Sequence, residues 1–87
     1  MYTIKINGNE NNVNAFAKFR TAASCTAPHE RHGQNVYVYV TGEEAEEAIN
    51  DIYNYIKQSL ETEGNDASSL EKGDSWVRYD GVEAYID

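Results

Sequence analysis

Three residues that could bind a metal or act as a nucleophile lie close together, Cys25, His29 and His32, in the spacing C-x3-H-x2-H. Thiolates and imidazoles are common zinc ligands, and a thiol next to a histidine base is a nucleophile. The spacing matches no familiar zinc pattern, and the chain holds no other cysteine or histidine to complete a four-ligand site. No third group that would orient a histidine base is identifiable. We therefore expect a small buried thiol and a polar loop, with no metal and no cofactor.

The chain is rich in carboxylates, with fifteen Asp and Glu residues, but their pattern does not indicate catalysis. Two carboxylates that act as acid and base need a cleft that raises the pKa of one of them, and the sequence shows no sign of such a cleft. The phosphate-binding patterns G-x-G-x-x-G and G-x-x-x-x-G-K-[ST] are both absent. We expect a protein that is not an enzyme.

The densest negative charge lies in the segment TGEEAEEAIND, residues 41–51. Acidic residues at the start of a helix interact favourably with its dipole, by about 0.3–1 kcal/mol each. That structural explanation covers Glu43, Glu44 and Glu46, which fall in or near the first turn. It does not cover a row of Glu43, Glu47 and Asp51 at four-residue spacing, where like charges repel by about 0.2–0.5 kcal/mol per pair. Two interpretations stay open: a solvated helix face, and an acidic ridge that binds a partner.

The two halves of the chain differ in charge. Residues 1–40 contain two acids and four bases, whereas residues 41–87 contain thirteen acids and three bases, and the whole chain has a net charge of −8. An anionic surface repels phosphates, so direct binding to nucleic acid is not expected. The expected partner is a protein or ribonucleoprotein surface rich in Lys and Arg, with fast and salt-sensitive association.

Length and composition predict a single domain over residues 1–87, with room for one core and one working surface. The first residues, MYTIKING, lack the basic region and apolar run of a secretory signal, and a lone cysteine cannot form an internal disulfide. A cytoplasmic protein is expected, in the host cytoplasm if a phage encodes it. No stretch approaches the roughly 18–20 apolar residues of a membrane helix, so no membrane role is expected.

Apolar periodicity predicts strands over residues 2–6 and 36–40, the latter reading VYVYV. Asn12 is a candidate N-cap for a helix over about 13–24, and the segment 26–33 is expected to be a loop.

A second helix is predicted from a capping-box pattern, Thr41 followed by Glu44, and from an apolar stripe. The stripe consists of Ala45, Ile49, Ile52, Ile56 and Leu60. The helix is expected to end near Gly64, which suits a left-handed C-terminal cap, and to be followed by a polar, mobile segment over residues 64–74.

The last segment, SWVRYDGVEAYID, has Asp80-Gly81 between alternating residues, the pattern of a two-residue type I′ hairpin. Because directly opposite residues share a face, Trp76 should oppose Tyr85. The core face is expected to carry Val77, Tyr79, Val82, Ala84 and Ile86, and the other face Trp76, Arg78, Glu83 and Tyr85.

The resulting order, β-α-β-α-β-β, predicts an α+β fold of two layers, a four-stranded sheet with two helices on one face. The other sheet face should then present Tyr37, Tyr39, Trp76 and Tyr85 beside Lys5, Arg78 and Glu83. Trp, Tyr and Arg are frequent anchors in protein interfaces. Tyrosines also stabilise exposed sheet faces by cross-strand pairing, and both interpretations stay open.

In character the chain resembles the small acidic inhibitors that phages and mobile elements use against host defence, the anti-CRISPR proteins and antirestriction DNA mimics. The segments TGEEAEEAIND and SWVRYDGVEAYID carry the resemblance, rather than a shared motif. It implies a non-enzymatic inhibitor that binds a basic nucleic-acid-binding surface of a defence complex, by mimicry of nucleic acid or at another site. The expected contact residues are Glu43, Glu44, Glu47, Asp51, Tyr37, Tyr39, Trp76, Arg78 and Tyr85. The alternative is a small cytosolic homodimeric interaction module with no role in defence inhibition.

Overall fold

Two helices and six strands make up the computed structural model, which describes residues 2–8 and 12–87. In chain order the elements are β1 (Tyr2–Asn7), α1 (Val13–Thr26), β2 (His29–His32), β3 (Asn35–Val40), α2 (Ala45–Thr62), β4 (Glu71–Lys72), β5 (Trp76–Tyr79) and β6 (Val82–Ile86). The fold class is therefore α+β, as the order of predicted elements indicated.

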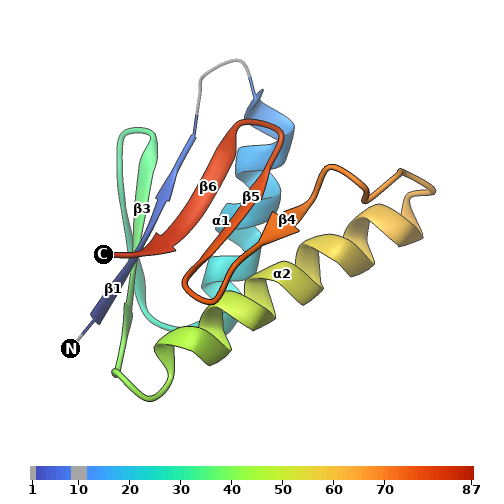
Figure 1. Cartoon of the computed structure of the whole chain (residues 1–87). Helices are drawn as coiled ribbons and strands as arrows, with labels where there is room; N and C mark the ends of the chain where they lie inside the picture. The colour runs from blue at the N-terminus through green and yellow to red at the C-terminus, as the bar shows by residue number, and fades with distance from the viewer. Residues whose placement is uncertain (1, 9–11) are drawn as a thin grey trace.

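The strands form one antiparallel sheet in the order β2-β3-β1-β6-β5-β4. The first strand of the chain, β1, is central and pairs with β3 on one side and with β6 on the other. Both helices lie on the same side of this sheet: α1 runs behind β5 and β6 in Figure 1, with α2 beside it. The predicted arrangement of two layers is confirmed, and the opposite sheet face remains open.

The core fills the space between the helices and the sheet. Its large, fully buried side chains are Phe19, Ile4, Ile6, Ile49, Ile52, Ile56, Leu60, Val36, Val38, Val77 and Val82. Each such side chain stabilises the fold by about 1.5–3 kcal/mol when it leaves water. The apolar stripe predicted for α2 is entirely within this core. No helix in the described part of the chain has the length and apolarity needed to cross a membrane.

The C-terminal hairpin has the predicted register, with Trp76 opposite Tyr85 and Tyr79 opposite Val82. Asp80 and Gly81 both have positive φ angles, 49° and 81°, as a type I′ turn requires. The predicted core face is also confirmed. Val77, Val82 and Ala84 are buried, and Tyr79 and Ile86 pack against the core while partly exposed.

The predicted number of strands is wrong, because the sheet has six strands and not four. One extra strand, β2, lies in the segment predicted to be a loop, and the other, β4, lies in the segment predicted to be mobile. Both are edge strands, and every residue of each is exposed. Alternating hydrophobicity reports burial of one face, so strands without a buried face leave no such signal. The expectation of a buried thiol is also wrong, since Cys25 is exposed near the end of α1.

The predicted side-chain caps are absent at both helix N-termini. Asn12 does precede α1, but its side chain makes no capping hydrogen bond. A turn occupies residues 42–44, in which the Glu44 N–H donates to the Thr41 carbonyl at 3.1 Å, so α2 begins only at Ala45. The predicted capping box of α2 is therefore wrong. The other helix, α1, continues two residues beyond its predicted end, to Thr26. The predicted end of α2 is confirmed by Gly64, whose φ is 76°.

Candidate functional site

Negative charge gathers where α2 begins, in a group of four exposed residues that we call the acidic cluster: Glu43, Glu44, Glu47 and Asp51. Glu43 lies in the turn before the helix, so the predicted helical row through Glu43, Glu47 and Asp51 is wrong at its first member. The other three carboxylates instead surround a shallow depression of about 190 Å³, together with Val40 and Ala48.

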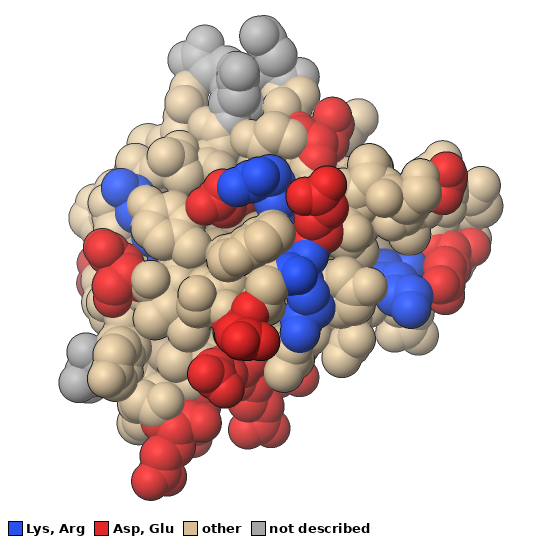
Figure 2. Space-filling model, viewed as in Figure 1, with Lys and Arg blue, Asp and Glu red and all other residues tan. Residues whose placement is uncertain are grey.

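The acidic cluster is not neutralised by cations of the described residues. The ion pairs among the described residues are Lys18–Glu63, His32–Glu30 and Arg78–Glu83. None of these pairs includes a member of the acidic cluster. Lys72 lies over the ring of Tyr53 at 5.8 Å from its centroid. Figure 2 shows acidic side chains collected at the end of the molecule where α2 begins, whereas acidic and basic side chains adjoin one another near the centre of the view.

The aromatic residues predicted for the open sheet face are brought together by the strand register. Tyr37, Lys5, Tyr85 and Trp76 lie directly opposite one another in turn, in a single row across β3, β1, β6 and β5. Tyr39 lies in the next row, opposite Thr3. All four aromatic side chains are partly buried. The sheet therefore presents a row of rings with one lysine in its middle.

Most of these side chains have partners within the protein. The Arg78 guanidinium lies over Trp76, 5.2 Å from the ring centroid. It also donates two hydrogen bonds to one oxygen of Glu83, from Nε at 3.0 Å and from Nη2 at 2.9 Å. These contacts fit the interpretation that the aromatic face is stabilised by cross-strand pairing. A partner that binds Arg78 must therefore compete with Glu83 and Trp76 for its guanidinium group.

At the β2 edge, the Glu30 carboxylate organises a small cluster that the sequence did not predict. Its Oε2 accepts a hydrogen bond from the Tyr39 hydroxyl at 3.2 Å and lies 3.2 Å from the His32 Nε2. The His32 ring meets Tyr37 edge-on, with centroids 5.3 Å apart. Partial burial, followed by the hydrogen bond and negative charge of Glu30, raises the pKa of Tyr39 above its ordinary value.

The residues considered as metal ligands do not form a site. Cys25 lies near the end of α1, and His29 and His32 occupy opposite ends of β2. In the strand register His29 faces Val38, a core position of β3, whereas His32 faces Asn35. Within residues 2–8 and 12–87, no three His, Cys, Asp or Glu side chains are grouped so as to hold a metal ion.

A larger cavity that the sequence did not predict lies between α1, α2 and the β5–β6 turn, and we call it the interhelical groove. It has a volume of about 760 Å³ and opens to solvent. Its lining residues are Asn14, Ala15, Ala17, Lys18, Thr21, Tyr55, Ser59, Leu60, Glu63, Asn65, Asp66, Tyr79 and Asp80. They come from three separate stretches of the chain, residues 14–21, 55–66 and 79–80, so no local pattern in the sequence could have indicated them.

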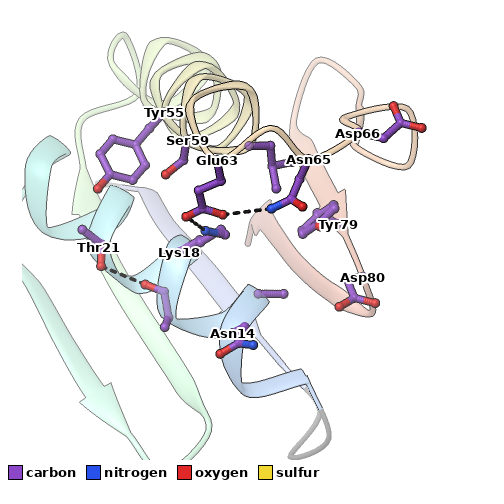
Figure 3. A pocket seen from close by; sticks show the side chains of 13 residues that line it. Asn14, Lys18, Thr21, Tyr55, Ser59, Glu63, Asn65, Asp66, Tyr79 and Asp80 are labelled. Carbon is purple, nitrogen blue, oxygen red and sulfur yellow. Dashed lines mark hydrogen bonds and ion pairs between the residues drawn. The ribbon is translucent and has the colours of Figure 1, made fainter.

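An ion pair lies at the centre of the interhelical groove (Figure 3). The Lys18 Nζ lies 2.7 Å from Oε1 of Glu63, and the side-chain amide of Asn65 donates to the other oxygen of Glu63 at 3.1 Å. The hydrogen bond from Lys18 is the main reason why the pKa of Glu63 lies below its ordinary value. Asp66, at the outer rim, also has a lowered pKa because the hydroxyl and the backbone N–H of Ser68 donate to it.

Comparison with known proteins identifies no relative. No family model, no curated protein and no solved structure matches the chain.

Proposed function

We propose that the protein is a non-catalytic inhibitor that binds a basic, nucleic-acid-binding surface of a host defence complex through its acidic cluster. The observation that carries this proposal is that Glu44, Glu47 and Asp51 are exposed around one depression and have no cationic partner among the described residues. Elsewhere the chain does pair carboxylates with its few cations, as Glu63 with Lys18. The cluster is thus available to cations of another molecule.

The position of the cluster suits binding to a Lys- and Arg-lined groove. Glu47 and Asp51 are one helical turn apart on α2, so their side chains begin about 5–6 Å from each other on a rigid support. A partner that supplies cations to both removes the repulsion between them. It also accelerates encounter with this highly acidic protein, whose net charge is −8.

The open sheet face supplies a second, less polar contact in this proposal. Tyr37, Tyr85 and Trp76 form one row, with Tyr39 beside it. Aromatic rings of this kind contribute large contact areas at interfaces. Tyr37, Tyr39 and Trp76 already have internal partners, in His32, Glu30 and Arg78, so these three rings add to an interface with little reorganisation.

The test is whether the acidic cluster is needed to inhibit nucleic-acid binding by a defence complex. CRISPR effector complexes assembled from purified components would be mixed with the protein, and binding of target DNA measured by gel shift. In the variant Glu44→Gln/Glu47→Gln/Asp51→Asn, we expect the concentration for half-inhibition to rise by at least about tenfold, as loss of three exposed charge pairs predicts.

A matched control removes three carboxylates outside the cluster, in the variant Glu46→Gln/Glu61→Gln/Glu71→Gln. Its potency should stay within about threefold of wild type, since only general charge attraction is reduced. Equal losses in the two variants would show that net charge alone matters and would sink the assignment to the cluster. If sedimentation shows a salt-sensitive dimer and no effector is inhibited, the homodimeric module is favoured instead.

A further inference from the structure

The interhelical groove has the composition of a site for a cation. Three acidic residues line it, Glu63, Asp66 and Asp80, against the single cation of Lys18. The Glu63 oxygens accept from Lys18 and Asn65, and those of Asp66 accept from Ser68, so the carboxylate without a partner among the described residues is that of Asp80. Lys18 is already bound to Glu63 at 2.7 Å. The groove therefore keeps an excess of negative charge.

The groove also offers aromatic walls. Tyr55 projects from α2 and Tyr79 from β5, with Lys18 and Glu63 between the two helices (Figure 3). Tyr55 is one of three large hydrophobic side chains of the described residues that are exposed, at 37%, with Tyr2 and Val13. Guanidinium groups stack on aromatic rings and donate paired hydrogen bonds to carboxylates, which a compact ammonium group does less well. This combination favours arginine over lysine as the occupant.

The same combination of an aromatic ring and a carboxylate already holds an arginine on the other face of the protein. Arg78 lies over Trp76 and donates twice to Glu83. In the groove, Tyr79 is followed directly by Asp80, whose carboxylate makes no hydrogen bond or ion pair with the described residues. The volume of about 760 Å³ lies within the range of about 300–1,000 Å³ that is usual for ligand sites.

One flank of α2 connects the groove to the acidic cluster. The depression at the start of the helix is lined by Glu44, Glu47 and Asp51, and the groove by Tyr55 and Ser59. Residues spaced by three or four positions lie on the same side of a helix. Asp51 and Ser59 are therefore only about 12 Å apart along the helix axis, at 1.5 Å per residue. A single basic segment can span both.

We propose that the interhelical groove binds an arginine side chain, presented by the same basic partner surface that the acidic cluster contacts. The origin of this arginine in the partner rests on the function proposed above. The affinity of the groove for arginine does not, and it can be measured on the protein alone.

The experiment uses the peptide Ac-Gly-Arg-Gly-NH2, with binding followed by ¹⁵N–¹H NMR shifts of the full chain. We expect saturable shifts at the amides of Lys18, Tyr55, Glu63 and Asp80. The citrulline peptide has almost the same shape without the charge and should bind at least about threefold more weakly, as should the lysine peptide. Shifts centred on the acidic cluster, no saturable shift in the groove, or equal binding of the citrulline peptide would each overturn the proposal.

A charge-removing variant tests the groove itself. Asp80→Asn keeps the turn, because Asn-Gly is favoured in type I′ turns, and it should weaken binding of the arginine peptide by about three- to tenfold. Asp74→Asn removes the same charge outside the groove and should leave affinity within about twofold. Binding of the arginine peptide without inhibition of any effector would keep the groove and remove its assignment to the partner. Inhibition that needs the acidic cluster, without peptide binding, would remove the groove and keep the proposed function.

Discussion

The indole of Trp76 has two close neighbours on the open sheet face. Arg78 lies over the ring. The backbone of Gly73 comes so close that a Cβ atom there would collide with the indole Nε1. The Gly73 N–H also donates to the Trp76 carbonyl at 2.9 Å, which ties the loop to the strand. Glycine is required at position 73 because of this close approach.

We predict that Gly73→Ala displaces the indole. Because Trp76 is the only tryptophan of the chain, its fluorescence reports this site alone. The emission maximum should shift to longer wavelength, and the free energy of unfolding should fall by about 1–3 kcal/mol, the usual cost of overpacking. Gly64→Ala controls for the fluorescence alone, since an added Cβ at residue 64 meets no atom within 4 Å, whereas its left-handed backbone, with φ of 76°, is expected to lower stability by a separate route. An unchanged Gly73→Ala spectrum would contradict the close packing.

At this scale the sequence identifies residues whose signal is local. The acidic cluster is visible as a run of glutamates, and the aromatic face follows from the alternation in VYVYV and in the hairpin. The interhelical groove was not predictable, because Lys18 and Glu63 meet across 45 positions of the chain. Only the packing of α1 against α2 brings them together, and no pattern within either helix encodes that contact.

At the scale of elements, α2 has a well-defined C-terminal end. The Asn65 N–H donates to the Leu60 carbonyl at 2.8 Å, and the Gly64 N–H donates to the Glu61 carbonyl at 3.1 Å. These are the two hydrogen bonds of a Schellman motif, with Gly64 in the left-handed region. The motif turns the chain sharply at Gly64 and so positions Asn65 and Asp66 along the groove.

Replacing Gly64 by alanine should lower the free energy of unfolding by about 1–2 kcal/mol, because a Cβ atom disfavours the left-handed conformation. Gly64→Asn should cost less, since asparagine adopts this conformation more readily. Urea denaturation of both variants beside wild type provides the measurement. If alanine and asparagine are equally harmless, the cap does not stabilise the helix as described.

The elements that were predicted correctly all bury an apolar face. For β1, β3, α1, α2 and the β5–β6 hairpin, burial selects a periodic sequence, and periodicity is readable without a structure. The strand β2 reads HERH and pairs with β3 through its backbone. Because all four of its side chains are exposed, its sequence shows no alternation of apolar and polar residues. The turn before α2 was also unpredictable, because Thr41–Glu44 fits a capping box equally well by sequence.

For the whole molecule, the paired carboxylates make stability depend on pH. The pKa of Glu63 lies below its ordinary value of 4.5, chiefly through the hydrogen bond from Lys18. A carboxyl group whose pKa is lower in the folded state stabilises the fold above its unfolded pKa, and this contribution is lost as pH falls through the folded value. Comparison of wild type with a variant that lacks the Glu63 carboxyl isolates this contribution.

We expect Glu63→Gln to have a lower Tm than wild type at pH 7 and the same Tm once the pH is well below 4.5, where Glu63 is protonated in both states. Thermal unfolding by circular dichroism between about pH 7 and pH 2.5 measures this convergence. Glu61→Gln serves as the control, because it removes an exposed carboxylate on the same helix that has no ion pair among the described residues. A Tm difference for Glu63→Gln that stays constant with pH would show that the pair with Lys18 does not stabilise the fold.

The start of β1 and the end of β6 lie side by side at one edge of the molecule. The Asp87 N–H donates to the Thr3 carbonyl at 2.8 Å, and the Tyr2 ring lies against Gly42, immediately before Glu43. A tag or fused domain joined behind Asp87 therefore begins beside Thr3, next to the Tyr2 that packs on the turn before the acidic cluster. Attachment to a sensor surface or a fluorophore is better made on the far side, through a thiol introduced as Ser69→Cys in the exposed segment between α2 and β4, with Cys25 replaced by serine.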